Sequence, residues 1–252
     1  MPRFRVDLHI HTLLSPCGEL SMSPEVIVRR ALAAGLDAIA VCDHNTTLQT
    51  PVVVEIGRRE GLAVFYGAEL TTREEAHLVA LLPDAETAAR LQAWIDAHIV
   101  RIPNRPDKLG DQMWVDEGEL IAGEVPWYLN APLGCSAEQT AAEVVRLGGL
   151  VVPAHVDRVA NSLVGQLGFL PAHLPVAALE YNHPARYEAL LHTHPNLRDY
   201  TAYTASDAHY PDAIGSNPAW LYAQNLTFGE LRMAMVEAVS YTHLTLPTKR
   251  IV

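Results

Sequence analysis

Two histidines near the start of the chain, His9 and His11, have the spacing of residues that could bind one metal ion. They lie in residues 6–12, where apolar and polar side chains alternate as in a strand. Successive strand side chains point to opposite faces, so Asp7, His9 and His11 share one face. Two imidazoles on one face can bind the same metal ion, although two hydrogen-bonded histidines at a polar strand end have the same pattern. The pair alone therefore indicates a metal site without establishing it.

Further polar residues lie at or beside the ends of later apolar segments. Each could be a capping or loop residue, but together they suggest one site, because the strand ends of a barrel meet at one rim. A carboxylate at such a position can bridge two metal ions. The groups are Asp43-His44, Glu69, His77, His155, Glu180 and Ser206-Asp207-Ala208-His209.

The segments between these groups alternate between short β-rich runs and helical stretches. We expect strands near residues 5–10, 37–42, 62–66, 77–82, 150–152, 176–180 and 200–204. We expect helices near residues 23–32, 50–60, 85–98 and 140–147, with another starting near 227. This alternation favours a parallel sheet with helical crossovers, and about seven strands favour a closed or nearly closed α/β barrel.

Residues 99–135 interrupt this pattern with several prolines and glycines and form an expected irregular excursion over one face. Excursions of this length are often functional lids. Its aromatic residues Trp114, Trp127 and Tyr128 could stack on a substrate ring or pack the segment down, and packing is the role we favour.

The composition restricts the class of protein. The 252 residues carry a formal net charge of −11. Because an acidic surface repels phosphate backbones, we expect no nucleic-acid partner. Three cysteines far apart imply no disulfide framework and fit a reducing cytoplasm. No signal-like start and no run of about 18 apolar residues occur, so we expect no membrane span.

The last residues, 239–252, resemble the translation of a transposon-end sequencing adapter. We therefore expect a single catalytic domain over residues 1–238, followed by a non-native segment that replaces the natural C-terminus.

The ordered set of polar groups resembles the PHP (polymerase and histidinol phosphatase) family of metal-dependent phosphoesterases, over about residues 4–238. The residues that carry the match are His9-Ile10-His11, Asp43-His44, Glu69, His77, His155 and Ser206-Asp207-Ala208-His209. The resemblance implies an α/β fold, a distorted (βα)7 barrel, with two or three divalent metal ions at its C-terminal rim. Mixed histidine and carboxylate ligands would accept Zn, Mn or Fe.

The resemblance also implies which residues bind each metal ion. The first ion would be held by His9, His11, Glu69 and Asp207, and the second by Glu69, His77 and His155. The third would be held by His44 and His209, with Cys17 as a further ligand or with this site weak or absent. Pro16, which cannot ligate, stands where many relatives have Asp. Asp7, Asp43 and Glu180 would support the ligands through hydrogen bonds, although Glu180 could instead contact substrate.

The expected reaction is hydrolysis of a small phosphomonoester or phosphodiester. Water that bridges two metal ions loses a proton near neutral pH, and the hydroxide would attack phosphorus in line. The expected catalytic residues are His9, His11, Glu69, Asp207 and His209. Three alternatives are an amidohydrolase, a PHP-type nuclease acting on DNA and a non-catalytic metal-binding regulatory module. The first often bridges its metal ions with a carboxylated strand lysine, which this chain lacks.

Overall fold

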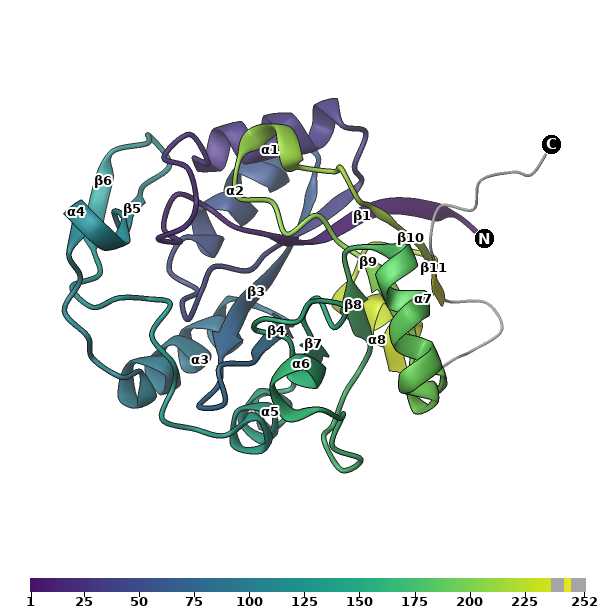
Figure 1. Ribbon diagram of the computed structural model, residues 1–252. Helices are drawn as coiled ribbons and strands as arrows, with labels where there is room; N and C mark the ends of the chain where they lie inside the picture. Colours follow the sequence, from purple (N-terminus) through teal and green to yellow (C-terminus); the bar gives the residue numbers. More distant parts are fainter. Residues whose placement is uncertain (237–242, 246–252) are drawn as a thin grey trace.

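The computed structural model describes residues 1–236 and 243–245 of the chain, so most of the segment 239–252 lies outside the described residues. In the described part, a seven-stranded mixed sheet has the order β11-β10-β1-β2-β3-β4-β7 (Figure 1). The three strands β1, β2 and β3 are parallel, and the other pairings are antiparallel. The strands are β1 (Arg3–Ile10), β2 (Ala38–Val41), β3 (Ala63–Thr71), β4 (His77–Leu82), β7 (Leu150–Pro153), β10 (Ala219–Tyr222) and β11 (His243–Thr245).

The sheet curls into a half-barrel. A separate parallel pair, β8 (Leu179–Tyr181) and β9 (Ala202–Thr204), lies beside the two edge strands, with β8 next to β7 and β9 next to β11. Backbone hydrogen bonds join the segments that flank this pair to β7 and to the end of β1. The N–H of Ala177 donates to the carbonyl of Val151 at 2.8 Å, and the N–H of His11 donates to the carbonyl of Ala208 at 3.0 Å. These links bring the segments that follow β7, β8 and β9 to the same rim as the end of β1.

The direction of β4 differs from the parallel arrangement that the sequence predicts. Only residues 72–76 connect β3 to β4, and a parallel crossover needs about a dozen residues or more. The two strands therefore form an antiparallel hairpin in which Thr71 pairs with His77. Because β7 is antiparallel to β4, it again runs with β3 and ends at the rim. The result is a mixed α/β sheet curled into a half-barrel, rather than a demonstrated (βα)7 barrel.

Several helices match the predicted ones because their ends carry clear signals. Helix α2 ends at Gly61, whose φ of 82° is in the left-handed region that glycine adopts easily. Helix α5 begins earlier than predicted because Ser136 and Gln139 form a capping box. The predicted helices are α1 (Pro24–Ala33), α2 (Thr50–Glu60), α3 (Ala85–His98), α5 (Ala137–Arg146) and α8 (Phe228–Val236). The helices not predicted are α4 (Pro106–Leu109), α6 (Leu163–Leu167), α7 (Pro184–Thr193) and the 3-10 turns η1 (Pro195–Asp199) and η2 (Pro211–Ala213).

The excursion at residues 99–135 is anchored to the body of the protein. It contains α4 and a hairpin of β5 (Met113–Val115) and β6 (Ile121–Glu124), at the left of Figure 1. The buried Gln49 side chain forms hydrogen bonds of 3.0 and 2.8 Å with the backbone carbonyl and N–H of Val115. The ring of Trp114 packs so closely on Gly123 that a Cβ there would lie 2.2 Å from it. These contacts support packing as the role of Trp114.

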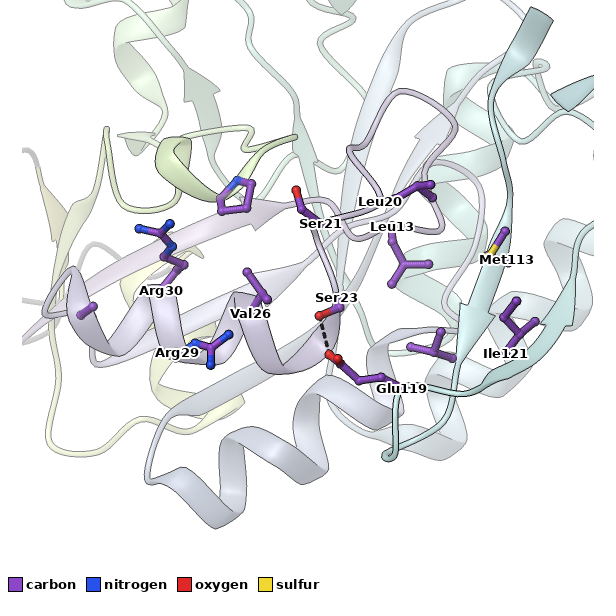
Figure 2. Close-up of a pocket in the computed structure, with 13 residues that line it drawn as sticks. Leu13, Leu20, Ser21, Ser23, Val26, Arg29, Arg30, Met113, Glu119 and Ile121 are labelled. Atoms are coloured by element: carbon purple, nitrogen blue, oxygen red, sulfur yellow. Dashed lines mark hydrogen bonds between the residues drawn. The ribbon is translucent and has the colours of Figure 1, made fainter. Parts of the chain in front are cut away.

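The hairpin also borders a hollow of about 840 Å³, which lies between it and α1 (Figure 2). The Ser23 hydroxyl donates to the Glu119 carboxylate across one side of this hollow. Its walls are mostly apolar, and none of the predicted metal ligands lines it. The predicted ligands lie elsewhere, at the rim of the half-barrel.

Among the described residues, no helix combines the length and apolar character that crossing a membrane requires.

Candidate metal centre

The predicted ligands come together at the rim of the half-barrel. In the described part of the chain, three groups of side chains each place their ligand atoms within 4.8 Å of one another. The groups are His9, His11, Glu69 and Asp207; His44, Glu69 and His77; and His11, His44 and His209. His155 joins them because its Nε2 lies 3.0 Å from Glu69 Oε1. We call these eight residues the metal centre.

Glu69, at the end of β3, is the middle of the centre. Its Oε1 lies 2.8 Å from His77 Nδ1, and its Oε2 lies 3.0 Å from His44 Nδ1. Glu69 Oε2 and His44 Nδ1 are both buried, and neither has a hydrogen-bond partner. A buried polar atom without a partner costs free energy, and a cation between these two atoms would satisfy both. The residues present therefore fit the divalent ions that the family implies.

Hydrogen bonds on the far side of each ring aim one nitrogen of three histidines into the centre. His9 Nδ1 lies 2.8 Å from Glu180 Oε2, and His209 Nδ1 lies 2.8 Å from the carbonyl of Asp207. A carboxylate oxygen and a carbonyl oxygen both accept, so the Nδ1 atoms donate and each Nε2 is turned toward the centre. Glu180 therefore supports His9, as the sequence predicts.

His11 is held by a relay through Ser15, a residue to which the sequence assigned no role. The Ser15 hydroxyl donates to Asp43 Oδ1 at 2.7 Å, so it accepts from His11 Nδ1 at 2.9 Å. Asp43 also accepts from the N–H of Thr12 at 2.7 Å. The predicted support of a histidine by Asp43 is thus indirect. The missed signal was a serine four residues after His11, a common pattern on its own.

Asp7 has a different role from the predicted support of a histidine. Its two carboxylate oxygens accept from the N–H groups of Ser206 and Gly215, at 3.0 and 2.9 Å. Burial raises the pKa of Asp7 above its ordinary value, while these hydrogen bonds oppose the rise. Asp7 therefore positions the segment that carries Asp207 and His209. A strand pattern places Asp7 on the face of His9, but it does not reveal which loop the carboxylate meets.

Burial and the neighbouring carboxylates have opposite effects on the pKa values of His9 and His11. Burial by itself lowers the pKa of His9, but the carboxylates of Glu180, Glu69 and Asp207 override it and hold that pKa well above its ordinary value. Burial likewise opposes protonation of His11, but the nearby carboxylates of Asp207 and Glu69 raise its pKa to about 9.

The other two histidines of the third group behave in the opposite way. Burial lowers the pKa of His44 to about 3, and burial together with repulsion from His11 lowers the pKa of His209 to about 4. Both rings are therefore neutral near pH 7, which is the form that binds metal ions.

The backbone at the centre is strained at three residues other than glycine. The φ angles of Asn45, His155 and Asp207 are 46°, 33° and 51°, in the left-handed region that residues with a Cβ rarely adopt. Such strain costs roughly 1–3 kcal/mol per residue and collects at functional sites. Two of the three residues are predicted ligands and the third follows His44. The strained backbone is thus consistent with a functional centre.

Cys17, the predicted extra ligand of the third group, is not among the side chains that converge. Its thiol is exposed, and its Sγ accepts from Asn130 Nδ2 at 3.9 Å. Cys17 stays a predicted ligand.

Arg158 lies beside the metal centre, and the sequence did not indicate this position. Its Nη2 lies 2.7 Å from Asp207 Oδ2, while Asp207 Oδ1 lies 3.1 Å from His11 Nε2. The two oxygens of Asp207 thus face different partners. An arginine three residues after His155 is an unremarkable sequence feature, and only the fold brings it to Asp207.

Comparison with known proteins finds similarity to one family over part of the chain. Residues 7–117 match the family model described as PHP domain. A 5'-3' exoribonuclease of Haemophilus influenzae is 28% identical over 112 residues, which are 43% of this chain and 39% of that protein. A DNA polymerase III of the PolC type from Caldanaerobacter subterraneus is 38% identical over 65 residues, which are 26% of this chain and 5% of that protein. The chain thus matches well under half the length of these relatives.

Among solved structures, the lesion-specific endonuclease PfuEndoQ from Pyrococcus furiosus has a TM-score of 0.69 at 17% identity, and the match covers 96% of this chain and 58% of that one. A structure of endonuclease Q with a 27-mer duplex substrate, which has an abasic lesion at the active site, gives the same TM-score at 16% identity, with the same coverage of both chains. At such identities the likeness concerns the fold.

The comparisons correct the expectation about partners. The sequence led us to expect a small phosphorylated substrate and no nucleic acid, because the formal net charge is −11. The similarity to an exoribonuclease, a DNA polymerase and endonuclease Q overturns that exclusion. The physical reason is that net charge sums over the whole chain, whereas a phosphate responds to the charges beside its site.

Proposed function

We propose that this chain, whose residues 7–117 carry a PHP domain, is a metal-dependent hydrolase that cleaves phosphodiester bonds in nucleic acid. The observation that carries the proposal is the arrangement around Glu69. Its buried carboxylate meets His44, His77 and His155, which come from three different segments, and one of its oxygens lacks a partner. Such a carboxylate, at the meeting point of several imidazoles, is suited to bridging two cations.

The metal ions would be held by the eight residues of the metal centre. When bound, divalent ions would lower the pKa of water and offset the negative charge that a phosphate develops during hydrolysis. The protein's own residues hold the geometry: Glu180 and Ser15 fix the rings of His9 and His11. Asp7 holds the segment that carries Asp207.

The choice of nucleic acid rests on the relatives rather than on the centre itself. The exoribonuclease and endonuclease Q act, by their names, on phosphodiester bonds of RNA and DNA. The match covers only part of each protein, so segments outside it can determine which nucleic acid each one cuts. A histidine and carboxylate centre sets the chemistry, while the surrounding surface sets the substrate.

The test is cleavage of labelled single-stranded and duplex DNA and RNA by the purified full chain. The protein is first stripped with EDTA and then assayed with and without added Mn²⁺ or Zn²⁺. We expect cleavage only with metal ions, and at least about a hundredfold loss in Glu69→Gln, which keeps the shape and removes the bridging charge.

Two outcomes would overturn the proposal. Equal cleavage by wild type and Glu69→Gln would show a contaminating nuclease. Metal binding without cleavage of any of the four substrates would instead favour a non-catalytic metal-binding module.

A further inference from the structure

A cavity of about 330 Å³ lies beside the metal centre, between α6 and α7, and has two arginines in its wall. Arg158 and Arg186 both line it. The remaining wall includes the apolar Val159, Val164 and Leu190, and also Asp157, whose carboxylate already accepts two backbone N–H groups. A cavity with two cationic groups and an apolar wall fits an anionic ligand that also has an apolar part, as a nucleotide does.

Arg158 connects this cavity to the metal centre. Its backbone is held on both sides, because its N–H donates to the carbonyl of His155 at 2.9 Å and its carbonyl accepts from the Ser162 hydroxyl at 2.5 Å. Its guanidinium contacts Asp207 Oδ2 and leaves 40% of the side chain exposed. A guanidinium has five N–H donors, so donors remain for a phosphate bound next to the centre.

Arg186 lines the same cavity from α7, and the backbone at the start of α7 is tied to the loop that carries Arg158. It is exposed in the first turn of α7, which begins at Pro184. The carboxylate of Asp157 accepts from the N–H groups of Asn182 and His183, both at 2.9 Å. Asp157 thereby ties the start of α7 to the loop that carries His155 and Arg158. The backbone segments that carry the two arginines are therefore held together.

We propose that Arg158 and Arg186 form a second phosphate subsite, which binds the phosphate of the nucleotide next to the hydrolysed bond. This inference rests on the proposed function. Arginine suits the task because its planar donors match phosphate oxygens. A substrate with a single phosphate, bound at the metal centre, would leave Arg186 unused. A strand offers successive phosphates, and its sugar and base can pack on the apolar wall.

The test compares two substrates, a dinucleotide with a 5'-phosphate and bis(p-nitrophenyl) phosphate, which has one phosphodiester and no neighbouring phosphate. The measured quantity is the ratio of their kcat/KM values. We expect Arg186→Gln to lower this ratio about tenfold, the loss of a charge-assisted hydrogen bond. The matched control, Arg90→Gln, removes an exposed arginine of α3 outside the cavity and should leave the ratio unchanged.

A second measurement does not depend on catalysis. Binding of a fluorescent oligothymidylate to the EDTA-treated chain is followed against salt concentration. Losing one phosphate contact should reduce the slope of log K against log salt by about 0.7 in Arg186→Gln. If the wild type cleaves both substrates and Arg186→Gln keeps both the ratio and the slope, the subsite is wrong and the proposed function stands. If the wild type cleaves neither, the proposed function itself fails.

Discussion

Replacing Ser15 by alanine tests the relay that positions His11. The Ser15 hydroxyl is fully buried and makes three hydrogen bonds. It accepts from His11 Nδ1 at 2.9 Å and from the N–H of His44 at 3.2 Å, and it donates to Asp43 Oδ1 at 2.7 Å. Alanine removes this oxygen and changes little else in volume. The ring of His11 then loses the hydrogen bond that holds it on the side away from the centre.

The expected cost follows from the groups left without a partner. Two buried donors lose their acceptor, while Asp43 Oδ1 keeps the N–H of Thr12. Each unsatisfied buried group costs about 1–3 kcal/mol, so we expect Ser15→Ala, which leaves two such groups, to lower the free energy of unfolding by about 2–6 kcal/mol. Residues that support a metal ligand change metal affinity by about 10–100-fold, and we expect a loss of that size for the first metal ion.

The assays are urea unfolding of the EDTA-treated protein and calorimetric titration with Zn²⁺ or Mn²⁺. Ser21→Ala is the matched control, since it removes the same atom from an exposed serine of the same loop. The hydroxyl of Ser21 donates to the carboxylate of Glu19. The effect of Ser21→Ala on stability should stay within about 0.5 kcal/mol. If Ser15→Ala matches Ser21→Ala in both assays, the orientation of His11 does not depend on the relay and the reasoning is refuted.

Two further predictions concern other supporting residues. Glu180→Ala should weaken metal binding about 10–100-fold, because it removes the acceptor of His9 Nδ1. Glu180→Gln should lose less affinity, because its amide oxygen can still accept. Equal metal affinities of wild type and Glu180→Ala in a calorimetric titration would contradict this. Asp84→Ala should destabilise the protein by about 1 kcal/mol at neutral pH, because Asp84 caps α3 by accepting from the N–H of Thr87. That hydrogen bond holds the pKa of Asp84 below 3.8, so its stabilisation is full above this value and is lost as the pH falls through the lower folded pKa. Urea unfolding should therefore show the difference between Asp84→Ala and wild type shrinking in acid, and a constant difference would count against the cap.

The sequence predicted which polar residues lie at strand ends because their pattern is local. The period of two in β1 placed His9 and His11 on one face, and the apolar segments before Asp43, Glu69 and His155 marked strand ends. Helix ends with local signals, such as Gly61 after α2, were also readable. What could not be read were contacts between distant segments. Ser15 meets Asp43 across 28 positions, and no local pattern announces that meeting.

The residue types and their order, determined by the sequence itself, are enough for the resemblance to PHP proteins and the set of candidate ligands. The tertiary structure decided which atoms of those ligands face each other, because that depends on how the half-barrel brings its strand ends to one rim. In the tertiary structure, β4 runs antiparallel to β3, and Asp7 forms hydrogen bonds with the segment that carries Asp207. Cys17 lies outside the converging side chains. The tertiary structure also brought Arg158 to Asp207, since the segments after β7 and β9 meet only when the sheet curls.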